Sequence, residues 1–158
     1  MNILRLWNKD LIDVLPKHQL LGQWRECCAI ASNLAKFETP NHILVNKILD
    51  YPIDHFYTYS IIFVYRELIK RGIKIAPHTL EQFSENIKEY SGRSYFEVIP
   101  PNKVFDCWHN TRYLLQCLSN LEELYDCGGI TFEEWFKILN KTRSMHVYCE
   151  ETYQSLFV

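Results

Sequence analysis

An arginine and a glutamate stand side by side in the apolar stretch LLGQWRECC, at Arg25 and Glu26. A guanidinium can bind a phosphate in a bidentate fashion, and a carboxylate can stabilise a developing cation or carry a proton. Neighbouring residues of a helix point about 100° apart around its axis, so these two charges diverge instead of pairing. Each charge must therefore be satisfied by a group outside the pair.

Basic, amide and aromatic side chains are concentrated around this pair. They are Arg5, Lys9, Lys17, His18, Gln19, Gln23 and Arg25, interleaved with Trp7 and Trp24. Such a set around one carboxylate can hold a phosphate and stack a base. The same pattern is also typical of a solvated helix face next to two core tryptophans. The residues by themselves leave the function open.

The cysteines and histidines do not predict a metal site. The six cysteines contain no Cys-x-x-Cys pair, and no His-x-x-x-His pair accompanies them. We therefore expect neither a metal nor a cofactor. Charges interrupt the N-terminal stretch MNILRLWNKD within ten residues, so no secretory segment is predicted and a reducing, cytoplasmic environment is expected. No apolar run approaches the roughly 18 residues that span a bilayer, so no membrane association is expected.

Composition predicts one folded, helical domain. Hydrophobic residues make up 47% and aromatic residues 15% of the 158 residues, which excludes a disordered chain. This length fits one domain, residues 1–158. Five glycines and six prolines supply few tight turns, which favours helices over a β-sandwich or barrel. The net charge of -2 gives no general basic field, so any nucleic-acid contact must come from a local patch.

The elements that must position Glu26 can be placed from periodicity and from prolines. A helix is predicted over residues 18–36, with a buried stripe of Leu20, Leu21, Trp24, Cys28, Ala31 and Ala35. Pro16 predicts a break just before it, so the first ten residues lead directly onto this helix. Pro40 and Pro52 bracket a short connecting segment, and a long helix is predicted from Ile53 until Gly72.

Three further helices are predicted in the second half of the chain. The first is capped by Thr79 with Gln82 and ends near residue 89, and the second spans residues 103–126. The third is capped by Thr131 with Glu134 and ends near residue 141. Residues 142–158 form a C-terminal extension whose pattern fits a helix or a strand. The prediction is a compact all-α fold in which the N-terminal segment lies next to the first long helix.

Two blocks, HQLLGQWRE and RELIKRGIKI, resemble the pyrimidine-dimer DNA glycosylase family, the phage-type UV endonuclease V enzymes. The longer stretches RLWNKDLIDVLPKHQLLGQWRECCAI and TPNHILVNKILDYPIDHFYTY resemble a bacterial and phage branch of that family. The resemblance covers roughly residues 3 to 141. It implies a compact all-α domain that acts on double-stranded DNA with a damaged or modified base.

The resemblance also implies a chemistry. In this family the N-terminal α-amine attacks the sugar C1′, expels the base and forms an imine that promotes β-elimination of the strand. An α-amine has a pKa of about 7.7–8.0, against about 10.4 for lysine, so it is partly neutral near pH 7. Carried over to this sequence, the assisting glutamate is Glu26, the phosphate contacts are Arg25 and Arg5, and the amine belongs to Met1 or Asn2.

The sequence departs from the family pattern in two places. The family's amine directly precedes the early arginine, whereas Met1, Asn2 and two further residues precede Arg5 here. A further family arginine, three residues after the glutamate, corresponds to Ala29. Lys9 is the nearest lysine that could form the imine instead.

The remaining candidates are polar residues that could reach the same cleft or the DNA backbone. They are His18, Gln19, Gln23, His42, Lys47 and His55, together with the basic helix end of Arg66, Lys70 and Arg71. Two alternatives to DNA repair stay open: a diverged protein that binds or processes a free nucleotide, and a purely structural interaction module.

Overall fold

The computed structural model describes residues 5–145, and these residues form helices joined by turns, without a β-strand among them. The predicted all-α fold is confirmed. The expected positions of Met1 and Asn2, and the expected helix or strand after residue 145, lie outside the described residues. No helix within residues 5–145 combines the length and the apolar character that crossing a bilayer requires.

The N-terminal region begins with a short 3-10 helix, η1 (Lys9–Val14), followed by the long helix α1 (Lys17–Phe37). The predicted break at Pro16 is confirmed, and Pro16 is the N-cap of α1. α1 ends where Glu38 adopts a left-handed conformation, with φ of 59°. The helix therefore spans one residue more at each end than the periodicity indicated.

The buried face of α1 differs from the predicted stripe. Its buried residues are Leu20, Gln23, Trp24, Cys27, Ile30, Ala31 and Leu34. The predicted Leu21, Cys28 and Ala35 are only half-buried. Gln23 is not part of the predicted buried stripe. In the structure this amide is buried since it has its own hydrogen-bond partners, described below.

The chain then passes through η2 (Asn46–Asp50), between Pro40 and Pro52, and enters the predicted long helix. This helix is one continuous run of α2 (Ile53–Tyr57), a π-helical segment η3 (Thr58–Tyr65) and α3 (Arg66–Lys70). Gly72 follows with φ of 70°, which confirms the predicted stop. The π-helical segment was not predicted, because side-chain periodicity does not report the backbone hydrogen-bond pattern.

Helix α4 (Pro77–Ser91) corrects the predicted capping box. The helix begins at Pro77 with Ala76 as N-cap, and Thr79 lies inside the first turn. The Thr79 hydroxyl instead donates to the Ala76 carbonyl at 2.7 Å and accepts from Trp24 Nε1 at 3.2 Å. Gly92, with φ of 69°, ends the helix.

The helix predicted over residues 103–126 is also corrected, because it begins only at Thr111. Residues 101–110 form turns in which Phe105 and Cys107 have φ of 49° and 71°, values that interrupt a right-handed helix. The Asn110 side chain then accepts from the backbone N–H of Tyr113 and caps α5 (Thr111–Asp126). Burial of the Phe105 ring against its aromatic neighbours Tyr51, His55, Tyr59, Trp108 and His109 offsets this backbone strain.

The last described helix is α6 (Phe132–Ser144), and its capping box is present as predicted. Thr131 accepts from the backbone of Glu134, while the Glu134 side chain accepts from the backbone of Thr131. The helix ends three residues later than expected.

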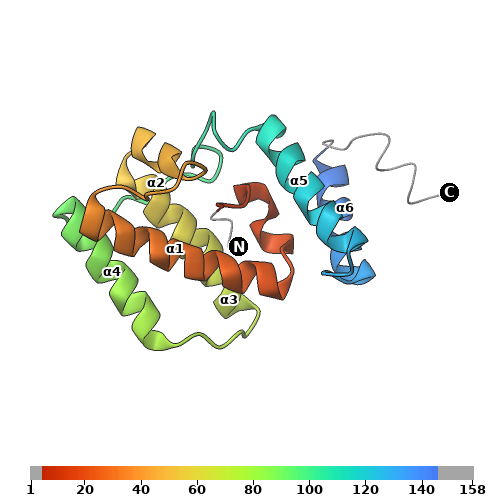
Figure 1. Ribbon diagram of the computed structural model, residues 1–158, viewed down its shortest axis with the longest axis horizontal. Coiled ribbons are helices and arrows are strands. Elements are labelled where there is room, and N and C mark those ends of the chain that lie inside the picture. The colour runs from red at the N-terminus through yellow and green to blue at the C-terminus, as the bar shows by residue number, and fades with distance from the viewer. Residues whose placement is uncertain (1–4, 146–158) are drawn as a thin grey trace.

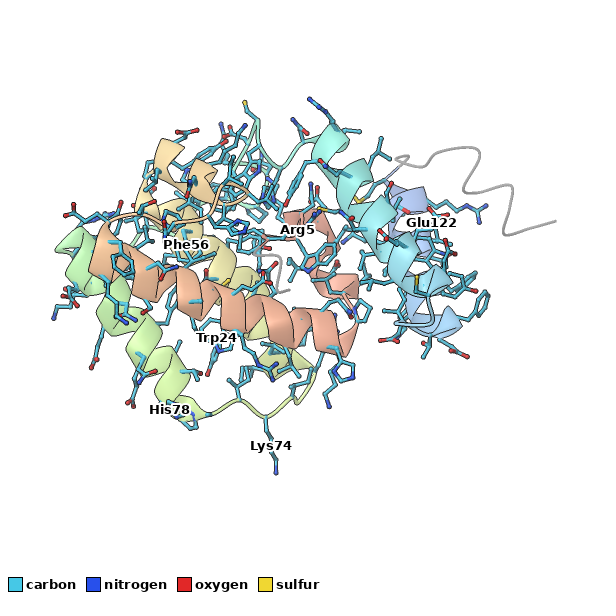
Figure 2. The ribbon with its side chains drawn as sticks, in the orientation of Figure 1. Arg5, Trp24, Phe56, Lys74, His78 and Glu122 are labelled. Atoms are coloured by element: carbon cyan, nitrogen blue, oxygen red, sulfur yellow. The ribbon has the colours of Figure 1, made fainter. Side chains whose placement is uncertain are left out.

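The arrangement of these elements places η1 in the middle of the molecule (Figure 1). α1 packs against α4 and against the helical run of residues 53–70, while α5 and α6 lie on the other side of η1. Residues 5–8, the described residues that precede η1, therefore run between α1 and α5. Figure 2 places Arg5 in this position.

Candidate active site

The extended segment of residues 5–8, together with Lys9, is held in place by side chains instead of by a neighbouring strand. The Arg5 backbone N–H donates to Glu26 Oε2 at 3.1 Å, and Gln23 Nε2 donates to the Arg5 carbonyl at 2.9 Å. The Trp7 backbone N–H donates to Gln23 Oε1 at 2.6 Å. The side-chain amide of Gln23 on α1 thus accepts from one backbone N–H of the segment and donates to one of its carbonyls. These two hydrogen bonds explain why Gln23 can be buried.

Aromatic and histidine side chains hold the same segment from its other sides. Tyr113 on α5 donates to the Leu6 carbonyl, and Tyr59 on η3 donates to the Trp7 carbonyl at 2.5 Å. His109 Nδ1 accepts from the Lys9 backbone N–H at 2.9 Å. Burial lowers the pKa of His109 to about 3, so its ring is neutral and can act as this acceptor.

These bonds come from α1, η3, the turn before α5 and α5 itself. Six backbone groups that would otherwise require water or a strand are paired with side chains in this way. The chain between Arg5 and Lys9 therefore has one well-defined path, which passes directly beside Glu26. We call this stretch, residues 5–9, the clamped segment.

Glu26 has an unusual electrostatic environment. Desolvation raises the pKa of its carboxyl group to about 7, against the opposing effects of the Arg5 N–H, the Arg5 charge and the Gln23 amide. Gln23 Nε2 lies 3.3 Å from Glu26 Oε2 and Arg5 N lies 3.1 Å from it, so this one oxygen receives both donors. Near pH 7 the group is present in both protonation states and can donate or accept a proton.

Glu26 opens onto a pocket of about 330 Å³ between α1 and α5. The described residues that line it are Arg5, Trp7, Glu26, Asn120, Glu123, Leu124 and Cys127. The Arg5 guanidinium lies over the Trp7 ring, 5.6 Å from its centroid. The pocket thus combines a flat aromatic wall, a cation and a partly protonated carboxyl group, and its volume lies at the lower end of small-ligand sites.

The structure does not bring Lys9 into this pocket. Its ammonium group donates to the Val104 carbonyl at 2.7 Å, and burial lowers its pKa. The side chain lines a different cavity of about 450 Å³, bordered by η1, η3 and Lys141, which does not include Glu26. Lys9 is therefore poorly placed to replace an amine that acts beside Glu26.

The other α1 candidates lie at different depths. His18 and Arg25 are exposed, and Arg25 points away from the pocket that Glu26 lines, as the helical spacing predicts. Gln19 is half-buried, and its Oε1 atom is buried without a hydrogen-bond partner among the described residues. Of the predicted set, the structure brings together Arg5, Gln23 and Glu26.

His42 and Lys47 are not part of this pocket. His42 Nδ1 accepts from the Leu44 backbone N–H at 3.3 Å and so stabilises a turn. Lys47 lines a third pocket of about 300 Å³, together with Trp108, Arg112 and other residues near the start of α5. His55 is also used structurally, because its Nδ1 accepts from the Phe105 backbone N–H at 3.1 Å.

The basic residues at the end of α3 have two different environments. Arg66 and Lys70 are exposed, as expected for a solvated face. Arg71 instead turns inward, donates to the carbonyls of Leu15 at 2.6 Å and Asp13 at 3.0 Å, and pairs with Glu67 at 2.9 Å. Its guanidinium is thus engaged by the carbonyls at the end of η1, and its suggested contact with a DNA phosphate stays a prediction.

Several residues of the site were not predicted. Tyr59, His109 and Tyr113 hold the clamped segment, and Asn120 and Glu123 line the pocket. On α5 the positions 116, 120, 123 and 127 form a polar stripe that periodicity can reveal. Nothing in the sequence indicates that this stripe faces Glu26, because that depends on how α5 packs across the chain.

Comparison with known proteins gives one match. The family model described as pyrimidine dimer DNA glycosylase matches residues 4–80, which contain the clamped segment, Gln23, Glu26 and Tyr59. No curated protein and no solved structure matches the chain in the other two comparisons. Among residues 5–145, no three His, Cys, Asp or Glu side chains gather in a metal-binding arrangement.

Proposed function

Because its residues 4–80 place this chain in the pyrimidine dimer DNA glycosylase family, we propose that it is a DNA glycosylase with AP-lyase activity. Its substrate is double-stranded DNA with a damaged or modified base, a pyrimidine dimer by family membership. The observation that carries the proposal is the hydrogen bond between the Arg5 backbone N–H and Glu26. It anchors Arg5, four positions after Met1 in the sequence, at a carboxyl group suited to proton transfer.

The nucleophile of the proposed reaction is the α-amine at the start of the chain, carried by Met1 or Asn2. Consecutive residues span at most about 3.6 Å each, so four residues reach no farther than about 14 Å. The Arg5 N atom is 3.1 Å from Glu26 Oε2. Covalent geometry therefore keeps such an amine within about 14 Å of Arg5 N, which itself lies beside Glu26.

The proposed steps use the protonation states that Glu26 provides. The amine attacks C1′ of the damaged nucleotide, the bond from C1′ to the base breaks with its electrons leaving on the base, and the base takes up a proton. Loss of protons from the attacking nitrogen and opening of the sugar give an imine. Removal of a C2′ proton then expels the 3′ phosphate by β-elimination. Ionised Glu26 stabilises the cationic sugar, and protonated Glu26 supplies a proton to a leaving atom.

Two further groups support binding of the substrate. Arg5 lines the pocket, where its guanidinium can contact a phosphate next to the damaged nucleotide, and Arg25 is exposed on α1 outside the pocket, where it can contact a more distant phosphate. Trp7 adds an aromatic side chain to the same pocket, against which an everted base can pack. Among the residues first singled out in the sequence, Arg5, Trp7 and Glu26 are the ones that share the pocket.

The test is borohydride trapping on a duplex with one abasic site, combined with an assay of strand cleavage. We expect a trapped adduct with the wild-type protein, and strand cleavage that is reduced at least about a hundredfold in Glu26→Gln. Glu81→Gln, an exposed glutamate on α4, is the matched control and should behave as wild type. Acetylation of the α-amine should abolish trapping. Absence of an adduct, together with Glu26→Gln cleaving as wild type, would contradict the proposal.

A second candidate function is the binding or processing of a free nucleotide. One observation favours it, which is that the carboxylate of Glu123 lines the pocket. This negative charge repels DNA, which carries many phosphates, more strongly than it repels a single nucleotide. The salt dependence of binding separates the two functions, because contact with several phosphates makes DNA affinity fall steeply with salt. Tight mononucleotide binding in a calorimetric titration, without DNA binding, would favour this second function.

A further inference from the structure

The clamped segment receives hydrogen bonds both from inside and from outside the residues matched to the family. Within residues 4–80, Glu26 on α1 accepts from the Arg5 backbone N–H at 3.1 Å. Beyond them, the Tyr113 hydroxyl on α5 donates to the Leu6 carbonyl. α5 lies across the segment from α1 (Figure 1), so Arg5 and Leu6 are held from two different helices. The part of the chain outside the family match thus helps to fix the path of the segment.

The turn before α5 fixes the end of the clamped segment. His109 Nδ1 accepts from the Lys9 backbone N–H at 2.9 Å, and the Val104 carbonyl accepts from the Lys9 ammonium group at 2.7 Å. The Asn110 carbonyl accepts from Asn8 Nδ2 at 3.3 Å. These three bonds fix the segment where it enters η1, not where it passes the pocket.

Tyr113 acts nearer to the pocket, as a donor to the backbone. Its half-buried ring packs against Trp108 and His109, with ring centroids 6.1 Å and 5.1 Å away. Burial raises the pKa of its phenol well above the usual range, so the hydroxyl keeps its proton near neutral pH. The described residues that line the Glu26 pocket do not include Tyr113. Its hydroxyl therefore influences that pocket through the Leu6 carbonyl.

The Leu6 carbonyl is coupled to Arg5 through covalent geometry. Leu6 follows Arg5 directly, and the peptide bond between them is planar, so a shift of Leu6 is passed on to Arg5. The distance of 3.1 Å from Arg5 N to Glu26 Oε2 is near the upper end of the usual range, and a shift of about 0.5 Å would break this bond. Without the Tyr113 hydroxyl, a partly buried carbonyl loses its donor, which favours such a shift.

We propose that Tyr113 is a positioning residue of the reaction, because its hydrogen bond to the Leu6 carbonyl holds Arg5 against Glu26. Arg5 in turn limits where the α-amine, at most four residues upstream, can lie. Membership of the family does not assign this role, since Tyr113 lies outside the matched residues. The inference rests on the proposed function, because the group that is positioned is the amine that forms the imine.

Removal of one hydroxyl group tests this role. Tyr113→Phe keeps the ring and deletes the donor. Tyr125→Phe is the matched control, because Tyr125 is also a half-buried tyrosine of α5, stacks on Trp135 with ring centroids 5.8 Å apart, and does not line the pocket. On an abasic duplex, we expect kcat of Tyr113→Phe to fall at least about fivefold, with KM within about twofold of wild type. Tyr125→Phe should match wild type in both constants.

The pKa of Glu26 gives a second readout, which a general loss of packing does not predict. Burial raises this pKa to about 7 against the opposing effect of the Arg5 backbone N–H. If the Tyr113 hydroxyl holds Arg5 in place, its removal weakens this opposing effect. We therefore expect the pKa of Glu26, measured by carbon-13 NMR of its carboxyl group, to rise above the wild-type value in Tyr113→Phe. It should stay unchanged in Tyr125→Phe.

A rescue experiment restores a donor without restoring the hydroxyl. Replacement of Tyr113 by 4-aminophenylalanine places an amino group where the phenol oxygen lies, and this group can donate to the Leu6 carbonyl. We expect kcat to return to within about twofold of wild type. The pKa of Glu26 should return to the wild-type value.

Three results would overturn the inference. The first is a wild-type kcat together with a wild-type pKa of Glu26 in folded Tyr113→Phe. The second is an equal loss of kcat in Tyr113→Phe and Tyr125→Phe. The third is a rise of KM alone, which would assign Tyr113 to DNA binding. Absence of abasic cleavage in the wild type would overturn the proposed function and this inference with it.

Discussion

Two carboxylates of this protein, Glu26 and Asp54, are both held by a backbone N–H, yet their environments differ. Asp54 accepts from the Glu97 backbone N–H at 2.7 Å and pairs with Arg93 at 2.6 Å, which holds the pKa of its carboxyl group below the usual range. Glu26 accepts from the Arg5 backbone N–H, has no ion pair within residues 5–145, and has its pKa raised to about 7 by burial.

These environments suit the two carboxylates to different roles, Asp54 to a structural ion pair and Glu26 to proton transfer. The pair of Asp54 and Arg93 fixes the loop after α4 to α2, so an ionised group with a permanent counter-ion suits it. A permanent counter-ion would keep Glu26 ionised and remove its ability to donate a proton. The absence of such a partner at Glu26 within the described residues is thus consistent with catalysis.

The largest expected effect comes from neutralising each carboxylate in turn. Glu26→Gln should lower strand cleavage of an abasic duplex about 10²- to 10⁴-fold with little loss of thermal stability, because it removes a group whose ionised form is desolvated. Asp54→Asn should leave cleavage nearly unchanged and lower the free energy of unfolding by about 2 kcal/mol through its weakened charged hydrogen bonds. Cleavage kinetics and urea unfolding measure both. Equal changes of cleavage rate and of unfolding free energy in the two variants would contradict the different roles of Glu26 and Asp54.

A second test removes the amide that connects Glu26 to the clamped segment. Gln23→Leu leaves the Trp7 N–H and the Arg5 carbonyl without their partners in a buried site. We expect the free energy of unfolding to fall by about 2–3 kcal/mol and cleavage to fall at least about tenfold. Gln116→Leu, on the polar stripe of α5, serves as a control for amide loss outside the clamped segment. Unchanged cleavage in folded Gln23→Leu would show that positioning of the segment is unimportant.

The pH dependence of stability should have opposite signs for the two groups. The pKa of Glu26 is raised in the folded state, so its contribution to stability is complete below about pH 4.5 and is lost as pH rises through about 7. The pKa of Asp54 is lowered from 3.8, so its contribution is present above that pH and is lost as pH falls through the folded value.

The free energy of unfolding of the two variants, measured by denaturant unfolding at several pH values, tests these opposite pH dependences directly. Relative to wild type, Glu26→Gln should gain stability between about pH 4.5 and 7. Asp54→Asn should lose less stability, relative to wild type, as the solution is acidified below pH 3.8. Equal slopes for Glu26→Gln and wild type across the upper range would contradict a desolvated Glu26.

The smallest expected effect concerns Arg25, the neighbour of Glu26 that points into solvent. Arg25→Gln should weaken binding to an abasic duplex and lower the slope of log affinity against log salt by about one, which corresponds to one lost phosphate contact. Lys36→Gln, an exposed lysine in the last turn of α1, is the control. If the slope for Arg25→Gln equals that of wild type, Arg25 does not contact a DNA phosphate.

The sequence predicted much of the first half of the site for identifiable reasons. Pro16 and the apolar spacing located α1, and the resemblance of LLGQWRECC to the family singled out Glu26. The burial of Gln23 was missed because a polar residue is expected outside unless its partners are known, and those partners lie 16 and 18 residues away.

The second half was less predictable. The left-handed residues Phe105 and Cys107 break a helix that the side-chain pattern alone continues, because ordinary residues carry no local signal for positive φ. The bond from Tyr113 to Leu6 spans 107 residues, and no local pattern reports such a contact. The α5 wall of the pocket follows from that packing and was therefore not predicted.

We propose that the amine which forms the imine belongs to the start of the chain. Peptide mapping by mass spectrometry, after borohydride trapping on an abasic duplex and proteolysis, tests it most directly. We expect the sugar adduct on the α-amine of the N-terminal peptide. An adduct on the Lys9 side chain, or on any other lysine, would contradict it.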